Sequence, residues 1–136
     1  MNTSLLTNAK TWMIVDDNEH LLMAMSAVLA NLTSADIECH SSPQSALAAF
    51  AAAPEKYALV ITDYEMPYMD GVALCGHIHA LAPHQTVFLA TGSGVFTEAA
   101  ARHAGFSALL NKPFPLAFLR QALRENLPET ADLMTA

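Results

Sequence analysis

Three aspartates, one threonine and one lysine provide the functional groups that phosphoryl-transfer chemistry uses. Asp16 and Asp17 follow one short apolar run, and Asp63 follows another. Thr91 and Lys112 come at the ends of two further apolar runs. Clustered carboxylates repel one another unless a cation joins them, and hard oxygen ligands suit Mg²⁺. Beside a metal ion, a carboxylate can act as a nucleophile and form an aspartyl phosphate.

The hydroxyl and the ammonium complete this chemistry. The Thr91 hydroxyl can hold one phosphoryl oxygen, and Lys112 can meet another as a point charge on a flexible stem. Gly92 lacks a Cβ, so the backbone there can approach a ligand closely. Positioning and charge neutralisation are most of what phosphoryl transfer needs, so the question is whether the fold brings these groups together.

The chain alternates short apolar runs with segments whose apolar residues recur every three or four positions, as on one face of a helix. Five strands are expected at residues 11–15, 37–40, 57–62, 85–90 and 106–110. Five helices are expected at about residues 21–32, 43–53, 72–82, 96–104 and 116–127. The first of these helices carries an apolar stripe of Leu21, Leu22, Met25, Val28, Leu29 and Leu32.

Strands that are apolar on both faces indicate a parallel sheet covered by helices on both sides, which is a doubly wound α/β fold. Such folds bind ligands at the carboxyl ends of the strands, where the strand order reverses. We call this edge of the sheet the carboxyl edge. All five candidate residues follow or end a predicted strand, so they are expected to meet there.

Composition excludes several classes of function. The chain has 136 residues, which suits one domain, and 53% of them are hydrophobic, which rules out a disordered tail. Six basic residues against thirteen acidic ones give a net charge of −7, so direct DNA binding is not expected. The apolar stretch 21–32 is too short to span a membrane, and the N-terminus does not resemble a signal peptide. A cytoplasmic protein is expected.

The cysteines and histidines indicate neither disulfides nor a zinc site. Cys39 and Cys75 are too few for a disulfide framework and are expected to be reduced. His77 and His79 lie close to Cys75, but no paired cysteine completes a zinc pattern.

The ordered motifs of the chain resemble those of the receiver domains of bacterial two-component response regulators. The resemblance rests on residues 13–18 (MIVDDN), 59–71 (LVITDYEMPYMDG), 89–92 (LATG) and 110–114 (LNKPF). It covers residues 10–127, which leaves an N-terminal extension at 1–9 and a C-terminal tail at 128–136. The resemblance implies a flavodoxin-like fold with five parallel strands in the order 2-1-3-4-5 and five helices.

The resemblance also implies roles for individual residues. Asp63 would be the phosphoacceptor. Mg²⁺ would be bound directly by Asp17, mainly through water by Asp16, and further by Asp63 and the backbone carbonyl of Glu65. Thr91 would be the switch hydroxyl.

Lys112 would bond the phosphoryl group according to the same resemblance. A cis peptide bond is expected between Lys112 and Pro113, where the family usually has one.

Two positions depart from the family pattern. Leu109 stands where the family usually has a Tyr or Phe that moves with the switch hydroxyl. Either the output is read through another element, such as the helix at 96–104, or Leu109 is simply a strand residue packed on the last helix. Glu65 and Ser93 lie two residues after Asp63 and Thr91, and we expect them to alter the dephosphorylation rate.

The function expected from this resemblance is that of a single-domain response regulator. It would accept a phosphoryl group from a histidine kinase or histidine phosphotransfer protein, and then switch partner binding or relay the group. Residues 128–136 are too few for a DNA-binding module, so a downstream protein would bind the face formed by residues 96–127. We expect no membrane partner, no enzyme activity beyond Mg²⁺-assisted self-phosphorylation and dephosphorylation, and a monomer or a phosphorylation-dependent dimer.

Three alternatives use the same residues differently. A Mg²⁺-dependent phosphatase could use Glu65, two residues after Asp63, as its acid or base, but no segment resembles a substrate-specificity cap. A degenerate receiver would bind partners without phosphorylation. A flavin carrier is disfavoured, because Asp16 and Asp17 would repel the phosphate after the first strand.

Overall fold

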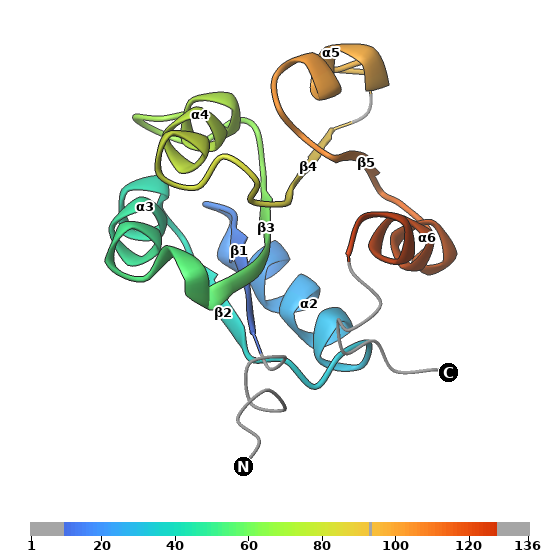
Figure 1. Cartoon of the computed structure of the whole chain (residues 1–136). Helices are drawn as coiled ribbons and strands as arrows, with labels where there is room; N and C mark the ends of the chain where they lie inside the picture. The colour runs from blue at the N-terminus through green and yellow to red at the C-terminus, as the bar shows by residue number, and fades with distance from the viewer. Residues whose placement is uncertain (1–9, 93, 128–136) are drawn as a thin grey trace.

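The computed structural model describes residues 10–92 and 94–127 (Figure 1). The predictions about residues 1–9, Ser93 and residues 128–136 concern parts of the chain outside these ranges. The strands are β1 (Thr11–Val15), β2 (Ile37–His40), β3 (Tyr57–Thr62), β4 (Val87–Gly92) and β5 (Ala108–Lys112). The helices are α2 (Glu19–Ala30), α3 (Pro43–Ala52), α4 (Gly71–Leu81), α5 (Glu98–His103) and α6 (Leu116–Asn126), with a short 3₁₀ turn, η1, at Pro54–Lys56.

The five strands form one parallel sheet in the order β2-β1-β3-β4-β5. The order reverses at β1, which pairs with β2 on one side and β3 on the other. Helices α2 and α6 lie on one face of the sheet, and α3, α4 and α5 lie on the other (Figure 1). The predicted doubly wound fold, its strand order and its five α-helices are confirmed. None of the helices within residues 10–92 and 94–127 has the length and apolar character needed to cross a membrane.

Alternate residues of the central strands pack into two separate hydrophobic cores, one on each face of the sheet. In β1, Trp12 and Ile14 belong to the core under α2 and α6, whereas Met13 and Val15 belong to the core under α3, α4 and α5. All four side chains are at most 3% exposed. Successive side chains of a strand point to opposite faces, so a strand covered on both sides must be apolar at every position. This explains the unbroken apolar runs of the sequence.

The last two strands begin and end two residues later than expected. The sequence predicted strands at 85–90 and 106–110, because their apolar residues lie there. In the structure, the parallel pairing of β4 with β5 continues through Thr91 opposite Asn111 and Gly92 opposite Lys112. The backbone ladder does not depend on apolar side chains, so it extends into the polar residues. Thr91 and Lys112 are therefore held inside strands rather than in loops.

Helix α5 is shorter than the predicted range of 96–104. The side chain of Thr97 accepts a hydrogen bond from the N–H of Ala100 and caps the helix, which begins at Glu98. Phe96 therefore lies in the loop before the helix.

The apolar stripe of α2 is only partly buried. Leu22 and Leu29 are buried, but Leu21 is 45% exposed and Val28 is 40% exposed. These two residues lie seven positions apart on the same side of the helix, beside the buried stripe. The predicted helix is present but lies two residues earlier than the expected range of 21–32, so Leu32 follows its end.

Two local features fix the loop after β3. The side chain of Asp70 accepts a hydrogen bond from the N–H of Ala73 and caps α4. A Cβ at Gly71 would collide with the backbone carbonyl oxygen of Asp63, so only glycine allows this close approach. The start of α4 is thus packed directly against Asp63, the residue that follows β3. The expected cis bond between Lys112 and Pro113 is also present, directly after β5.

Candidate functional site

Three aspartates gather at the carboxyl edge of the sheet. Asp16 and Asp17 follow β1, and Asp63 follows the neighbouring strand β3. One carboxylate oxygen from each of the three lies within 4.8 Å of the others. Asp16 is buried, Asp63 is half-buried and Asp17 is exposed, so the cluster opens to solvent on one side. Carboxylate oxygens at this spacing can share a hard divalent cation.

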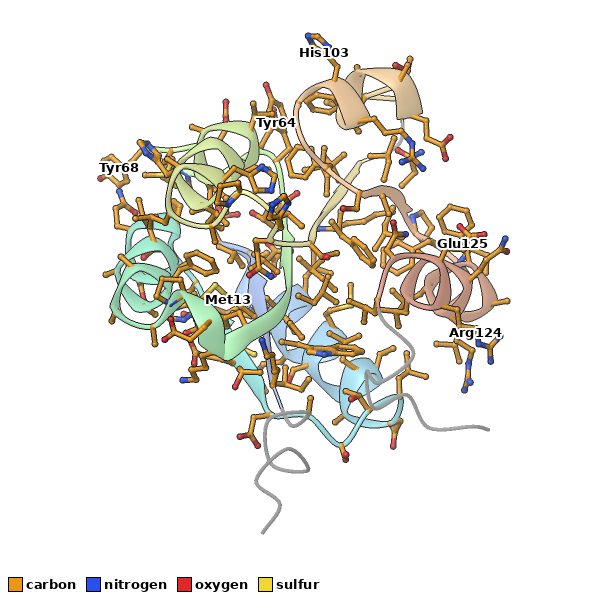
Figure 2. The ribbon with its side chains drawn as sticks, in the orientation of Figure 1. Met13, Tyr64, Tyr68, His103, Arg124 and Glu125 are labelled. Atoms are coloured by element: carbon orange, nitrogen blue, oxygen red, sulfur yellow. The ribbon has the colours of Figure 1, made fainter. Side chains whose placement is uncertain are left out.

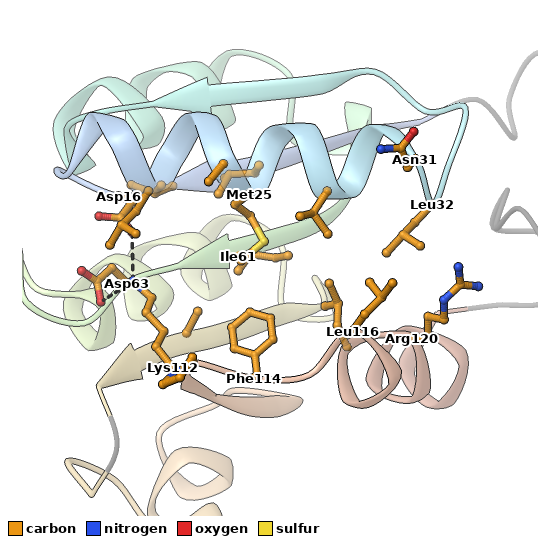
Figure 3. Close-up of a pocket in the computed structure, with 18 residues that line it drawn as sticks. Asp16, Met25, Asn31, Leu32, Ile61, Asp63, Lys112, Phe114, Leu116 and Arg120 are labelled. Carbon is orange, nitrogen blue, oxygen red and sulfur yellow. Dashed lines mark hydrogen bonds and ion pairs between the residues drawn. The ribbon is translucent and has the colours of Figure 1, made fainter. Parts of the chain in front are cut away.

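Lys112 joins this cluster from the end of β5. Its Nζ donates a hydrogen bond to Asp16 Oδ2 at 3.0 Å and lies 3.7 Å from Asp63 Oδ1 (Figure 3). The ammonium therefore lies between a carboxylate from β1 and one from β3. The sequence predicted that these groups would share one edge, and the structure brings them into contact.

The carboxylates of Asp16 and Asp63 each also accept a hydrogen bond from a backbone N–H. Asp16 Oδ1 accepts a hydrogen bond from the N–H of Asn18 at 2.9 Å, so both of its oxygens have protein partners. Asp63 Oδ1 accepts one from the N–H of Tyr64 at 2.8 Å. These bonds fix the directions of the two carboxylates.

The acidic surroundings perturb the pKa of Asp63. Burial raises the pKa of this carboxyl above its usual value, and the nearby charges of Asp16 and Asp17 raise it further. The ammonium of Lys112 and the N–H of Tyr64 act in the opposite direction and do not fully compensate. The site therefore holds more negative charge than its own lysine neutralises. A bound cation would relieve this repulsion, so the residues fit a metal ion.

The remaining predicted site residues lie close by in the fold. Thr91 is buried near the end of β4, the strand beside β3. Glu65 lies in the loop after β3 and is exposed. Its side chain does not belong to the group of three carboxylates at metal-binding spacing, which is the only such group in the part of the chain that the structure describes.

An apolar hollow of about 700 Å³ adjoins this cluster between α2 and α6. Asp16, Asp63 and Lys112 lie at one end of it, and Asn31 and Arg120 lie at the other (Figure 3). Its walls include the exposed side chains Leu21 and Val28 of α2 and Leu116 of α6. This hollow was not predicted from the sequence. The seven-residue spacing of Leu21 and Val28, which puts both on one side of α2 beside the buried stripe, could have indicated it.

The comparison with known families settles what kind of domain this is. The sequence model described as the response regulator receiver domain matches residues 12–124. The chain belongs to the response regulator receiver family. Receiver domains are the signalling modules of two-component systems rather than classical enzymes.

Longer regulators contain similar receiver domains. The C4-dicarboxylate transport transcriptional regulatory protein DctD of Rhizobium meliloti is 33% identical over 120 residues, which cover 88% of this chain and 25% of DctD. The response regulator protein FleR of Pseudomonas aeruginosa is 36% identical over 103 residues, or 75% of this chain and 21% of FleR. The chain thus spans about a quarter of the length of these curated relatives.

Solved receiver structures share the fold. A receiver domain protein from Clostridium thermocellum aligns with a TM-score of 0.78 and 24% identity, over 86% of this chain and 93% of that one. The signal receiver domain of an HD domain-containing protein from Pseudomonas fluorescens aligns with a TM-score of 0.76 and 28% identity, over the same shares of the two chains.

Within the receiver fold, Leu109 lies on the opposite face of the sheet from the last helix. It is 6% exposed and belongs to the core under α3, α4 and α5, together with Ala101 and Phe106. The expectation that it packs on the last helix was wrong. It is the next residue, Leu110, that faces α6, because neighbouring side chains of β5 point to opposite faces.

Cys75 and His79, two of the residues that raised the question of a zinc site, have structural partners instead. His79 Nε2 lies 2.9 Å from the carbonyl oxygen of Gln85, and its other ring nitrogen lies 3.7 Å from Cys75 Sγ. Burial raises the pKa of the Cys75 thiol to about 11, so this thiol is neutral and unreactive near pH 7.

A second polar cluster lies away from the acidic site. Glu38 accepts hydrogen bonds from the Tyr57 hydroxyl at 2.7 Å and from Lys56 Nζ at 3.0 Å, and one of its oxygens lies 2.7 Å from His40 Nε2. Burial alone would raise the pKa of Glu38, but these three partners outweigh it and bring the pKa to about 2. The cluster ties β2 to the beginning of β3 across β1.

Proposed function

We propose that this receiver domain accepts a phosphoryl group on Asp63 from a histidine kinase or a histidine phosphotransfer protein. The observation that carries the proposal is the position of Lys112, whose Nζ lies 3.0 Å from Asp16 Oδ2 and 3.7 Å from Asp63 Oδ1 at the edge where three carboxylates meet. Negative charge alone would repel a phosphoryl donor. The ammonium of Lys112 supports Asp63 as the nucleophile, and the spacing of the three carboxylates supports a metal ion as a second cation.

The residues that would hold Mg²⁺ are Asp16, Asp17, Asp63 and the backbone carbonyl of Glu65. Exposed Asp17 is the carboxylate best placed for direct contact, whereas both oxygens of Asp16 already accept hydrogen bonds. This supports an indirect, water-mediated role for Asp16. When bound, the metal ion would neutralise charge on the entering phosphoryl group.

The chemical step uses the Asp63 carboxylate as nucleophile. An oxygen of Asp63 forms a bond to phosphorus while the bond from phosphorus to the donor's imidazole nitrogen breaks, and the imidazole keeps the electron pair and takes up a proton. Lys112 binds one phosphoryl oxygen and the Thr91 hydroxyl donates to another. The product is an aspartyl phosphate.

The proposal includes the surroundings of this step. The domain comprises residues 10–127, works in the cytoplasm, and after phosphorylation either engages a downstream protein through the face of residues 96–127 or passes the phosphoryl group on. Phosphorylation would act on a monomer or produce a dimer.

Intact-mass spectrometry after incubation with Mg²⁺ and acetyl phosphate tests the acceptor. The wild type should gain the mass of one phosphoryl group, and Asp63→Asn should gain none. Asp70→Asn is the matched control: Asp70 lies in the same loop and only caps α4, and asparagine caps a helix equally well. This variant should be phosphorylated like the wild type.

Two results would overturn the proposal. One is the same gain in mass on Asp63→Asn as on the wild type, which would place the phosphoryl group elsewhere. The other is no gain on the wild type together with no binding of beryllofluoride and Mg²⁺. The domain would then be a binding module that acts without phosphorylation.

A further inference from the structure

An aromatic pair lies beside the acidic cluster. The rings of Tyr64 and Phe96 meet edge to face, with centroids 4.8 Å apart and an angle of 83° between their planes. Tyr64 directly follows Asp63, and Phe96 lies just before Thr97, the residue that caps α5. Figure 2 shows Tyr64 between α4 and α5. The pair thus joins the loop after β3 to the loop before α5.

The backbone of Tyr64 is fixed at both of its polar groups. Its N–H donates to Asp63 Oδ1 at 2.8 Å, and its carbonyl accepts from the N–H of Gly71 at 2.8 Å. The peptide that orients the Asp63 carboxylate therefore also sets the position of the Tyr64 ring. A change at Asp63 Oδ1 acts on this peptide directly.

Helix α5 is lightly anchored. It spans six residues, and Ala101 is its one buried residue. A short helix with little buried surface changes position at low cost. The contact of Phe96 with Tyr64, just before the N-terminal end of α5, is therefore expected to have a large effect on the position of this helix.

The strand position at which the family usually has an aromatic ring cannot provide this link here. Leu109 is buried and has no ring whose edge could move with the threonine. The Tyr64–Phe96 pair reaches the same side of the sheet, because both residues pack against the core under α3, α4 and α5.

We propose that Tyr64 is a positioning residue that transmits the phosphorylation state of Asp63 to α5 through its contact with Phe96. The inference rests on the proposed function, since it takes Asp63 as the acceptor. On phosphorylation, the Asp63 carboxylate becomes an acyl phosphate, with one bridging oxygen and one carbonyl oxygen. Neither oxygen carries the carboxylate charge, so Oδ1 becomes a weaker acceptor for the N–H of Tyr64. The peptide shifts, the ring moves with it, and the edge-to-face contact with Phe96 changes. Contacts of this kind bias a two-state equilibrium by roughly 2- to 10-fold.

The test combines intact mass with hydrogen exchange of the backbone amides of residues 96–104, measured with and without acetyl phosphate in the presence of Mg²⁺. In the wild type, full phosphorylation should change the exchange rates of this segment several-fold. Tyr64→Ala should gain the same phosphoryl mass but show less than a twofold change. Tyr64→Phe keeps the ring and should restore the wild-type response.

Tyr68→Ala is the matched control for removing an aromatic ring from this loop. Tyr68 is 94% exposed, and Figure 2 shows it on the side of α4 away from α5. This variant should respond like the wild type. Phe96→Leu removes the other ring without altering the acceptor loop. It therefore tests the link between Tyr64 and α5 even if Tyr64→Ala does not fold. It too should lose the response.

The outcomes separate the two proposals. If the wild type gains no phosphoryl group, the proposed function fails, and this inference fails with it. If phosphorylation proceeds normally but Tyr64→Ala and Phe96→Leu respond like the wild type, only the link through Tyr64 is overturned. A fully phosphorylated wild type with unchanged exchange at residues 96–104 overturns it as well.

Discussion

Asp63 is held in a place that disfavours its own charge. Its pKa is raised by burial and by two neighbouring carboxylates, so the ionised side chain destabilises the folded state at any pH above that pKa. The fold thus keeps Asp63 in place at a cost in stability, which a bound cation would offset.

The substitution Asp63→Asn should therefore stabilise the metal-free protein. We expect the free energy of unfolding at pH 7 to rise by about 1 kcal/mol, the size of the repulsion between two unit charges 4 Å apart in bulk water. Urea denaturation in the presence of a chelator measures this change. A loss of stability would show that the attraction between Asp63 and Lys112 outweighs the repulsion in the cluster.

With Mg²⁺ added, the wild type should become more stable to unfolding than Asp63→Asn. A ligand that binds only the folded state at 100 times its Kd stabilises it by about 2.7 kcal/mol. We expect this gain for the wild type and little of it for Asp63→Asn, with Asp70→Asn behaving as the wild type.

For individual residues, the sequence predicted the contacts that follow from the order of the strands. It did not predict the contacts that depend on side-chain packing. Asp16, Asp63 and Lys112 could be expected to meet, because the ends of parallel strands share one edge. The contact of Tyr64 with Phe96 could not be expected, since it depends on the paths of two loops and on the rotamers of their side chains. The same holds for Leu109, whose partners depend on which face of β5 it occupies.

Among the elements, β3 and α4 are joined by a close backbone contact. A Cβ at Gly71 would overlap the carbonyl oxygen of Asp63, whereas one at Gly76, in the middle of α4, would meet nothing within 4 Å. A side chain is thus excluded at Gly71 but has open space at Gly76.

Alanine at each position should show the difference. Gly71→Ala should lower the free energy of unfolding by about 2 kcal/mol or more, because either the helix start or the acceptor must move. Gly76→Ala should raise it by about 1 kcal/mol through better helix propensity. Denaturant titrations of the two variants provide the comparison. Equal effects at the two positions would contradict the close approach of α4 to Asp63.

The Glu38 cluster links β2 to β3 and gives this edge of the sheet a pH dependence. The pKa of Glu38 is about 2 in the folded protein against an ordinary value of 4.5. The carboxyl is thus more acidic when folded, so its stabilising effect is complete above pH 4.5 and is lost as the pH falls toward 2.

Glu38→Gln should remove this dependence. The side chain is 26% exposed, and we expect a loss of about 1 to 2 kcal/mol at pH 7, typical of hydrogen bonds to a charged group with some solvent screening. Between pH 4.5 and 2 the variant should lose less stability than the wild type, as measured by urea denaturation at each pH. Parallel pH curves for the two proteins would show that Glu38 is not the group responsible.

Element boundaries were harder to predict than element types. All five strands and five α-helices were expected from periodicity, but β4 and β5 extend two residues further than their apolar runs. Hydrogen bonds between backbones continue the strands wherever a neighbour is present, and the sequence alone does not show how far that neighbour extends. This extension is what places Thr91 and Lys112 on rigid strands.

For the whole molecule, one sheet serves two cores. Trp12, the only tryptophan of the chain, is 1% exposed and reports on the core under α2 and α6. Neighbouring residues of the same strand belong to the opposite core. Neither core can be lost without freeing β1, so the domain should unfold in one step.

Variants in the two cores test this cooperativity. Leu29→Ala lies in the core of Trp12, and Ile78→Ala lies in the opposite core; both side chains are 0% exposed. Each should lower the free energy of unfolding by about 2 to 5 kcal/mol. Urea titrations followed by Trp12 fluorescence and by far-UV circular dichroism should give one common midpoint for each variant. A midpoint of Trp12 fluorescence that Ile78→Ala leaves unchanged would mean that the cores melt separately.

The ion pair between Asp16 and Lys112 closes across 96 positions of sequence, from the first strand to the last. During synthesis, the acidic residues leave the ribosome long before the lysine does. A partly made chain therefore carries the acidic edge without its fixed cation, and a product truncated before β5 can never acquire it. The acidic edge and its fixed cation are thus complete only once β5 has been made, so every step that needs both must follow the synthesis of that strand.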